Sequence, residues 1–299
     1  MKNPKNIPWF RLLKLGISLG VDLATRLRVS VLRLFGIRTA GSCVILNYHS
    51  ITADQREAFA RQLDIVCRWA TPVRVDRAST SPPGKNAAAI TFDDGFEDFL
   101  LQALPELRTR NLPSTVFVIV RAVGQEFGTR ERLDRVMSVQ QLRDLPEDLV
   151  TIGSHTLTHP FLPETTKTEA YQEIVESRKQ LEKMLDRPIE LFSFPFGGFT
   201  PALVDICREA GYRRVFTTLP TLASADPQGF AVGRVRADTT DWPLETRLKI
   251  AGAYRWLPLA FALKRRILNN RVFRMGSGRW LPSVRRKIPY ALIRYSAND

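Results

Sequence analysis

The sequence predicts an α/β protein in which parallel strands form a sheet or barrel covered by helices. Short runs of apolar and β-branched residues alternate with longer amphipathic stretches through the middle of the chain, and this alternation is typical of repeated strand–helix units. Several predicted strands end in an aspartate or a histidine, and active sites of parallel sheets lie at that carboxyl edge. A chain of 299 residues with 44% hydrophobic residues suits one large domain with additional segments.

The strand and helix patterns follow one another along the chain. Strands are predicted, in order, at residues 43–48, 72–75, 87–92, 114–120, 149–153, 189–194, 214–218 and 231–236. Helices are predicted at residues 55–69, 99–110, 139–144, 165–185 and 201–210. The charged stretch 124–135 is predicted to be a loop or lid, and variable loops of this kind build substrate grooves.

The net charge of +14 is concentrated at the two ends of the chain. Residues 1–38 carry +7 and residues 255–299 carry +10, so the part between them is mildly acidic. We therefore expect a basic amphipathic N-terminal region (1–40), a central domain (41–250) and a basic, aromatic-rich C-terminal segment (251–299). Such ends favour a polyanionic partner, and with no recognised nucleic-acid module we expect an anionic membrane surface and no nucleic acid.

Residues 1–40 are predicted to form a basic amphipathic helix. Polar residues recur at spacings of three and four, at Arg11, Lys14, Ser18, Asp22 and Arg26. The charges among them interrupt every window of about 20 apolar residues that a spanning helix needs, and also the apolar region of a secretory signal. We favour a helix in the membrane interface, with a helix packed on the domain as the alternative. The expected location is cytoplasmic, peripherally associated with the inner face of the cell membrane.

Candidate catalytic groups cluster at predicted strand ends. Asp93 and Asp94 end the strand at 87–92, and all three histidines, His49, His155 and His159, closely follow predicted strands. The i, i+4 spacing of the last two places two imidazoles on one face of a turn, and with one carboxylate they leave an open coordination position. That combination is typical of a hydrolytic metal site. The alternatives are an ordinary Asp-Asp-Gly turn and structural histidines.

These motifs resemble those of the NodB-type polysaccharide deacetylases, carbohydrate esterase family four. The resemblance rests on Thr-Phe-Asp-Asp-Gly at 91–95, His-Thr-Leu-Thr-His at 155–159 and Phe-Pro-Phe-Gly at 194–197. The Tyr-His pair at 48–49 is similar to the subgroup that contains the poly-N-acetylglucosamine deacetylases. The resemblance covers roughly residues 43–241 and implies a distorted (β/α) barrel with fewer than eight strands.

The resemblance also implies roles for individual residues. Asp94, His155 and His159 would bind the metal, usually Zn²⁺, with Co²⁺, Ni²⁺ or Mn²⁺ as alternatives. Asp93 would be the general base that takes a proton from the attacking water. The backbone N–H of Phe196, in the motif with Pro195 and Gly197, would stabilise the oxyanion together with the metal.

Two departures from the family pattern affect the support of the base and the source of the acid. Ser193 stands where an arginine commonly orients the base, and Arg234 and Asp238 are candidates for that task, with ordinary strand residues as the alternative. The family commonly has a late histidine as general acid, but no histidine follows His159. The resemblance of the Tyr-His pair to the poly-N-acetylglucosamine subgroup implies that His49 replaces that acid, with a supporting contact as its alternative role. Trp242 is a candidate for a sugar-binding groove or for the core.

The predicted function is metal-dependent hydrolysis of the N-acetyl group of an amino sugar, in a glycan or a lipid-linked saccharide of bacterial polysaccharide or cell-envelope biosynthesis. A deformylase acting on a lipid-linked amino sugar and an O-deacetylase are alternatives that use the same groups. An inactive barrel that binds glycan or membrane is the alternative of another class.

Overall fold

The computed structural model describes residues 9–37, 39, 41–77, 86–129, 132–225 and 229–264. The expectations for residues 1–8 and for most of the C-terminal basic segment (265–299) lie outside the described residues. The predicted division of the chain at residues 40 and 250 stays a prediction.

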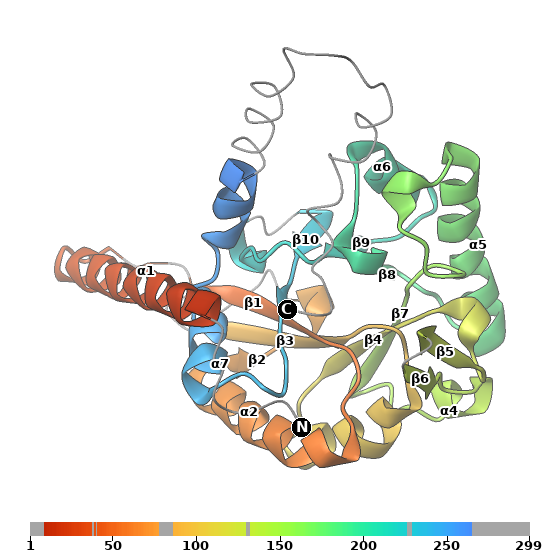
Figure 1. Cartoon of the computed structure of the whole chain (residues 1–299), viewed down its shortest axis with the longest axis horizontal. Helices are drawn as coiled ribbons and strands as arrows, with labels where there is room; N and C mark the ends of the chain where they lie inside the picture. Colours follow the sequence, from red (N-terminus) through yellow and green to blue (C-terminus); the bar gives the residue numbers. More distant parts are fainter. Residues whose placement is uncertain are drawn as a thin grey trace.

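The centre of the molecule is a parallel sheet that curls into a barrel (Figure 1). Its strands run in the order β10-β9-β8-β7-β4-β3-β1-β11, and β2 pairs with the first two residues of β3, Ala87 and Ala88. Their bounds are β1 (Cys43–Tyr48), β2 (Thr71–Pro72), β3 (Ala87–Phe92), β4 (Ser114–Val118), β7 (Val150–Ser154), β8 (Leu191–Ser193), β9 (Arg214–Thr217), β10 (Ala231–Gly233) and β11 (Val235–Arg236). Every pairing within this sheet is parallel.

The two ends of the sheet meet at Arg234. β10 pairs with β9 on one side and β11 pairs with β1 on the other, and Arg234 alone separates β10 from β11. The two short strands are therefore halves of one extended segment that closes the barrel, and this segment is the predicted strand 231–236. With these halves counted once and β2 left out as a side strand of β3, seven strands form the barrel wall, so the expected distorted (β/α) barrel with fewer than eight strands is confirmed.

Helices cover the outside of the barrel (Figure 1). Their bounds are α1 (Trp9–Leu34), α2 (Arg56–Trp69), α3 (Leu104–Thr109), α4 (Val139–Arg143), α5 (Lys167–Leu185), α6 (Pro201–Glu209) and α7 (Pro243–Ile250), with a π-helical turn at Phe99–Ala103 leading into α3. Capping boxes begin α4 at Ser138 and α5 at Thr166, where each hydroxyl accepts from a backbone N–H three residues later.

Alternation along the strands separates the two sides of the barrel wall. In β1, Val44 and Leu46 belong to the large apolar cluster beneath the helices, whereas Cys43 and Ile45 belong to a second cluster, which contains Phe117 and fills the barrel interior. The next inward position of β1 is Asn47. The interior thus changes from apolar to polar toward the carboxyl ends of the strands, where the candidate site lies.

The structure corrects one expectation and adds one helix that was not predicted. Residues 124–135, predicted as loop or lid, contain an antiparallel hairpin of β5 (Glu126–Thr129) and β6 (Arg132–Arg135). α7 was not predicted, although Pro243 stands in its first turn and the Glu245 carboxylate accepts from the backbone N–H of Trp242 at the N-cap. In the part of the chain that the structure describes, no helix combines the length and hydrophobicity needed to cross a bilayer.

Candidate active site

Asp93 lies at the carboxyl end of β3, inside the rim of the barrel. Its backbone N–H donates to the carbonyl of Tyr48 on the neighbouring strand at 3.0 Å, which extends the sheet by one step. Its side chain is buried and follows the inward positions of Ala87, Ala89 and Thr91. The two alanines are small, and they leave room in the barrel interior for longer side chains above them.

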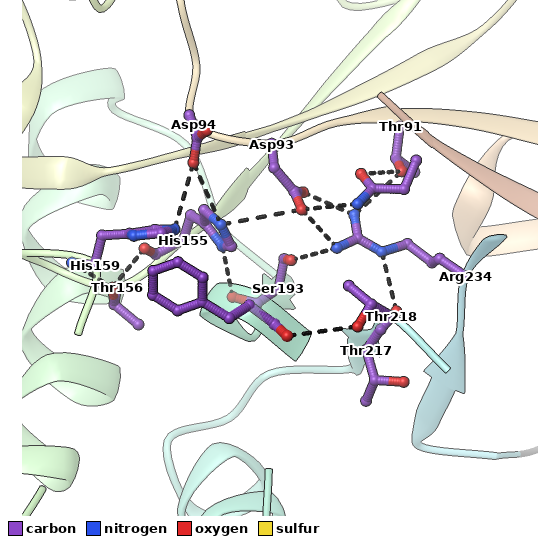
Figure 2. A network of polar contacts seen from close by, with 12 residues as sticks. Thr91, Asp93, Asp94, His155, Thr156, His159, Ser193, Thr217, Thr218 and Arg234 are labelled. Atoms are coloured by element: carbon purple, nitrogen blue, oxygen red, sulfur yellow. Dashed lines mark hydrogen bonds and ion pairs between the residues drawn. The ribbon is translucent and has the colours of Figure 1, made fainter. Parts of the chain in front are cut away.

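Arg234 holds the Asp93 carboxylate with both prongs of its guanidinium. Nη1 donates to Oδ1 and Nη2 donates to Oδ2, each at 2.7 Å (Figure 2). Nη2 also donates to the hydroxyl of Ser193 at 2.7 Å, Nη1 to that of Thr91 at 3.1 Å, and Nε to the Thr217 carbonyl at 3.3 Å. All five donor directions of a guanidinium are limited to one plane, so this set fixes the carboxylate orientation.

The side chain of Ser193 is short, so the guanidinium of Arg234 has room to lie beside it and donate to its hydroxyl. The arginine that commonly occupies this position in the resembled family is absent, and a guanidinium reaches the same carboxylate from the strand that closes the barrel. Arg234 is completely buried, and its guanidinium carbon lies 5.2 Å from the centre of the Phe117 ring. Asn47, whose Nδ2 donates to Asp93 Oδ2 at 3.1 Å, completes the contacts of the carboxylate.

Burial and nearby cations act in opposite directions on Asp93. Burial alone would raise its pKa, but the Arg234 guanidinium, with His155 and His49, outweighs that effect and holds the pKa well below its usual range. Asp93 is therefore ionised at neutral pH, with its two oxygens fixed by Arg234.

Asp94, His155 and His159 bring three ligand atoms together. Asp94 Oδ1 lies 3.6 Å from His155 Nε2 and 3.5 Å from His159 Nε2, and all three atoms lie within 4.8 Å of one another. These separations are too long for good hydrogen bonds, and Asp94 Oδ1 is buried without a hydrogen-bond partner. An ion bonded at about 2.1 Å to each of two atoms at a tetrahedral angle separates them by about 3.4 Å. The residues therefore fit a divalent metal.

A backbone carbonyl determines which ring nitrogen of His155 carries the proton. His155 Nδ1 lies 2.8 Å from the carbonyl oxygen of Ser193, which can only accept, so Nδ1 carries the proton and Nε2 offers its lone pair. Burial lowers the pKa of His155, and it lowers the pKa of His159 to about 3. Both rings are neutral at pH 7, which is the form that binds a metal.

Of the three residues in the cluster, Asp94 is the one whose ligand oxygen has no hydrogen-bond partner. Burial, followed by the charge of Asp93, raises its pKa to about 8 in the metal-free protein. A buried carboxylate with an orphaned oxygen, beside two neutral imidazoles, supplies what a divalent cation would need.

The turn that carries both histidines is strained and held from α5. Thr156 and His159 have positive φ values of 68° and 63°, as does Asp94 at 73°, and such left-handed conformations in non-glycine residues cost energy. Glu173 on α5 compensates by accepting from the backbone N–H groups of Leu157 and Thr158, each at 2.9 Å, and from the Thr158 hydroxyl at 2.6 Å. Glu173 was missed by sequence reasoning, because nothing in an amphipathic helix marks one glutamate as a loop anchor.

The third motif forms a tight turn beside His159. Pro195–Gly197 make one turn of 3₁₀ helix, in which Phe196 has a φ of 57° and Gly197 a φ of 68°. A Cβ on Gly197 would lie 2.0 Å from Thr218 Oγ1, so only glycine fits there. The exposed Phe196 ring lies 4.7 Å from the imidazole of His159, and Phe127 of β5 lies 5.6 Å from the same imidazole, measured between ring centres.

The other predicted residues lie at different distances from the chemistry. His49 follows β1 and is exposed, and its pKa is lowered by partial withdrawal from water, an effect that Asp93 opposes and that Arg236 and Arg234 reinforce. Asp238 accepts from the backbone N–H and the hydroxyl of Thr240 in the loop after β11, so of the two candidates Arg234 is the one that orients Asp93. Trp242 lies at the contact between α1 and α7. The guanidinium carbon of Arg11 lies over its indole, 4.4 Å from the ring centre.

Asn47 and Thr91 are the remaining residues that sequence reasoning missed. Both occupy inward positions of their strands, two residues beyond an inward apolar residue, and both contact the Asp93–Arg234 pair. A polar residue that interrupts an inward apolar run near the end of a parallel strand is the signal that could have found them.

Comparisons with known proteins agree with this geometry. A family model described as polysaccharide deacetylase matches residues 80–215. YxkH of Bacillus subtilis, provisionally named a polysaccharide deacetylase, is 26% identical over 203 residues, 64% of this chain and 70% of that protein. A peptidoglycan-N-acetylglucosamine deacetylase of Bacillus cereus is 30% identical over 135 residues, 45% of this chain and 57% of the other. The solved structure of IcaB from Ammonifex degensii shares the fold, with a TM-score of 0.60 at 24% identity, covering 73% of this chain and 99% of that one.

Proposed function

Because this chain belongs to the polysaccharide deacetylase family, hydrolases that act on the N-acetyl amide bonds of carbohydrates, we propose that it removes the N-acetyl group of an amino sugar with the help of a divalent metal. The observation that carries the proposal is the pairing of an ionised carboxylate, Asp93, with the adjacent three-ligand cluster of Asp94, His155 and His159. The distance from His155 Nε2 to Asp93 Oδ2 is 4.0 Å, so base and ligands share one space.

The metal, for which Zn²⁺ is our first expectation and Co²⁺, Ni²⁺ or Mn²⁺ are alternatives, would lower the pKa of water and polarise the amide carbonyl when bound. Asp93 accepts the proton of the attacking water at a carboxylate oxygen. Because Arg234 keeps the Asp93 pKa low, Asp93 is a weak base that is ionised before the reaction, and its contribution is orientation more than proton affinity. The backbone N–H of Phe196, in the turn with Pro195 and Gly197, is proposed to donate to the developing oxyanion.

His49 is proposed to protonate the leaving amine. Its lowered pKa means that the resting imidazole is neutral, so it must gain a proton during the reaction before it donates one. The proton released from water at Asp93 would be the source, and the negative charge of Asp93 favours the protonated form of His49. A pair of groups that passes one proton from water to amine needs no other acid.

The substrate is proposed to be an N-acetylated glycan or a lipid-linked saccharide of polysaccharide or cell-envelope biosynthesis. The Tyr-His pair at 48–49 supports an assignment close to the poly-N-acetylglucosamine deacetylases. The basic ends support action on the inner face of the cell membrane, where a peripherally bound cytoplasmic protein would meet lipid-linked sugars. The hairpin of β5 and β6 lies beside the site and is the element that we expect to contact the sugar.

The test is acetate release from lipid-linked N-acetylhexosamine and from chitin oligomers, by the wild type and by Asp93→Asn. We expect release that requires added metal and that falls at least about 10²-fold in Asp93→Asn, which keeps the shape but loses the base. Formate release from a formamido sugar without acetate release would replace the proposal by a deformylase, and release from O-acetyl sugars alone would replace it by an esterase. Metal binding without any release would indicate a binding protein.

A further inference from the structure

Helix α1 packs on the domain through polar residues. Its two buried residues are Ser18 and Asp22, and both are polar. Asp22 accepts from Arg247 of α7 at 3.1 Å, and the Ser18 hydroxyl accepts from the indole N–H of Trp256 at 3.0 Å. The polar stripe that normally faces water is thus used to attach the helix to the protein.

The opposite side of α1 is apolar and exposed. About 100° of rotation per residue places the leucines of this side opposite Ser18 and Asp22. Leu23 is 58% exposed, Leu27 68% and Leu34 85%. The exposed apolar residues of α1 are Trp9, Phe10, Leu12, Leu13, Ile17, Leu19, Leu23, Leu27, Val31 and Leu34. We call this set the outer face of α1, and Figure 1 shows that the helix projects beyond the barrel. The two fixed polar contacts prevent the helix from turning this face toward the core.

Basic side chains border the outer face. Lys14, Arg26 and Arg28 are exposed, and the same rotation places them at the margins between the attached and the outer side. Arg33 is exposed in the last turn, in line with the attached side. Apolar residues flanked by cations match the boundary between acyl chains and anionic headgroups. Arg26 already pairs with Asp22 at 2.9 Å. An uncharged protein partner would leave Lys14 and Arg28 unmatched, and the C-terminal segment 265–299 is itself strongly basic and would be repelled by them.

The first turns of α1 are attached to the catalytic edge of the barrel. Arg11 donates to the Thr240 carbonyl at 2.6 Å and to Glu245 through Nε at 3.0 Å. Thr240 lies in the loop that follows β11, at the edge where Asp93 ends β3. The outer face and the catalytic edge are therefore linked through the hydrogen bonds of Arg11 to Thr240 and Glu245.

We propose that the outer face of α1 inserts into the interface of an anionic bilayer and thereby holds the catalytic edge beside the headgroups. The membrane part of the proposed function rests on this surface, whereas the chemistry at Asp93 does not. A substrate whose sugar is anchored in the same bilayer would then reach the site by moving in two dimensions.

The test uses the full chain and vesicles of phosphatidylcholine with and without phosphatidylglycerol, in a sedimentation assay. Wild type should bind the anionic vesicles, and Leu23→Glu should weaken binding about tenfold or more, because it places a charge on the inserted side. Leu101→Glu is the matched control, since Leu101 is 56% exposed but lies on the turn before α3, and it should bind like the wild type. Raised salt should weaken binding to the anionic vesicles.

Activity separates this proposal from the proposed function. Leu23→Glu should keep acetate release from chitin oligomers, which also shows that it is folded, and should lose release from a vesicle-anchored sugar. Equal vesicle binding by wild type and Leu23→Glu would overturn the proposal. So would a discrete dimer that Leu23→Glu dissociates without any lipid binding, because the outer face would then be a contact between copies. If vesicles bind as expected but no substrate releases acetate, only the proposed chemistry fails.

Discussion

The guanidinium of Arg234 and the carboxylate of Asp93 form a two-pronged ion pair across 141 positions of sequence. Arg234 is also the single residue between β10 and β11, where the barrel closes. Closure of the barrel and orientation of the candidate base therefore depend on the same residue. The usual position for an orienting arginine holds Ser193, and its hydroxyl accepts from the displaced guanidinium.

Replacing Arg234 should reduce turnover through misplacement of Asp93. We expect Arg234→Lys to lower kcat by about 10²-fold with little change in KM, because a single ammonium cannot fix both carboxylate oxygens. The pKa of Asp93 should rise, so the acid limb of the pH–rate profile should move to higher pH. Arg234→Met should also destabilise the fold by about 3–5 kcal/mol, because it leaves Asp93 buried and unpaired.

Arg236→Lys is the matched control for Arg234. Arg236 lies two residues away on the same segment, its side chain is 44% exposed, and its nearest Asp238 contact is 3.9 Å. Its replacement should change neither kcat nor the acid limb. An unchanged pH profile in Arg234→Lys, with only lowered stability, would reduce Arg234 to a structural residue.

Local pattern was sufficient to predict a parallel α/β sheet or barrel, because buried parallel strands are continuous apolar runs and their carboxyl ends collect the aspartates and histidines. The choice of a distorted barrel came from the family resemblance. Local pattern could not choose among the partners of Asp93. Arg234 and Asp238 are both polar residues near the end of the same strand, and only closure of the barrel decides which side chain enters it. Glu173 and Asn47 were missed for the same reason, since their partners are distant in sequence.

Metal binding should be linked to pH through Asp94. Its pKa of about 8 in the metal-free protein is raised above the ordinary value, so this group costs the metal-free fold stability as pH rises from about 4 to about 8. A metal must displace the proton, so its apparent affinity should rise with pH up to about 8, by at most tenfold per unit. Calorimetry in buffers of different ionisation enthalpy should detect about one proton released per ion near pH 6.

Asp93→Asn tests the cause of that linkage. The charge of Asp93 is the second reason for the raised pKa of Asp94, after burial. Without it, the pH dependence of metal affinity should move to lower pH. Proton release that is identical in wild type and Asp93→Asn would contradict the assigned coupling.

Glu173 should support metal affinity without touching the ligands. Glu173→Ala removes the acceptor for Leu157, Thr158 and the Thr158 hydroxyl, so the strained turn should relax and His159 should move. We expect metal affinity to fall about tenfold, at the lower end of what outer contacts contribute. Glu176→Ala is the control on the same helix, because Glu176 pairs with Lys179 at the surface. Equal metal affinity in the two variants would contradict this role.

Phe196 combines backbone strain with an exposed ring, and two substitutions separate these features. Phe196→Ala and Phe196→Gly both remove the ring beside His159, so both should raise KM for the sugar equally if the ring contacts substrate. Only glycine relieves the left-handed backbone at φ 57°, so Phe196→Gly should be more stable than Phe196→Ala by about 1 kcal/mol. Thermal unfolding measures the second difference and steady-state kinetics the first. A KM that stays at the wild-type value in both would place the sugar away from this turn, on the side of the β5–β6 hairpin.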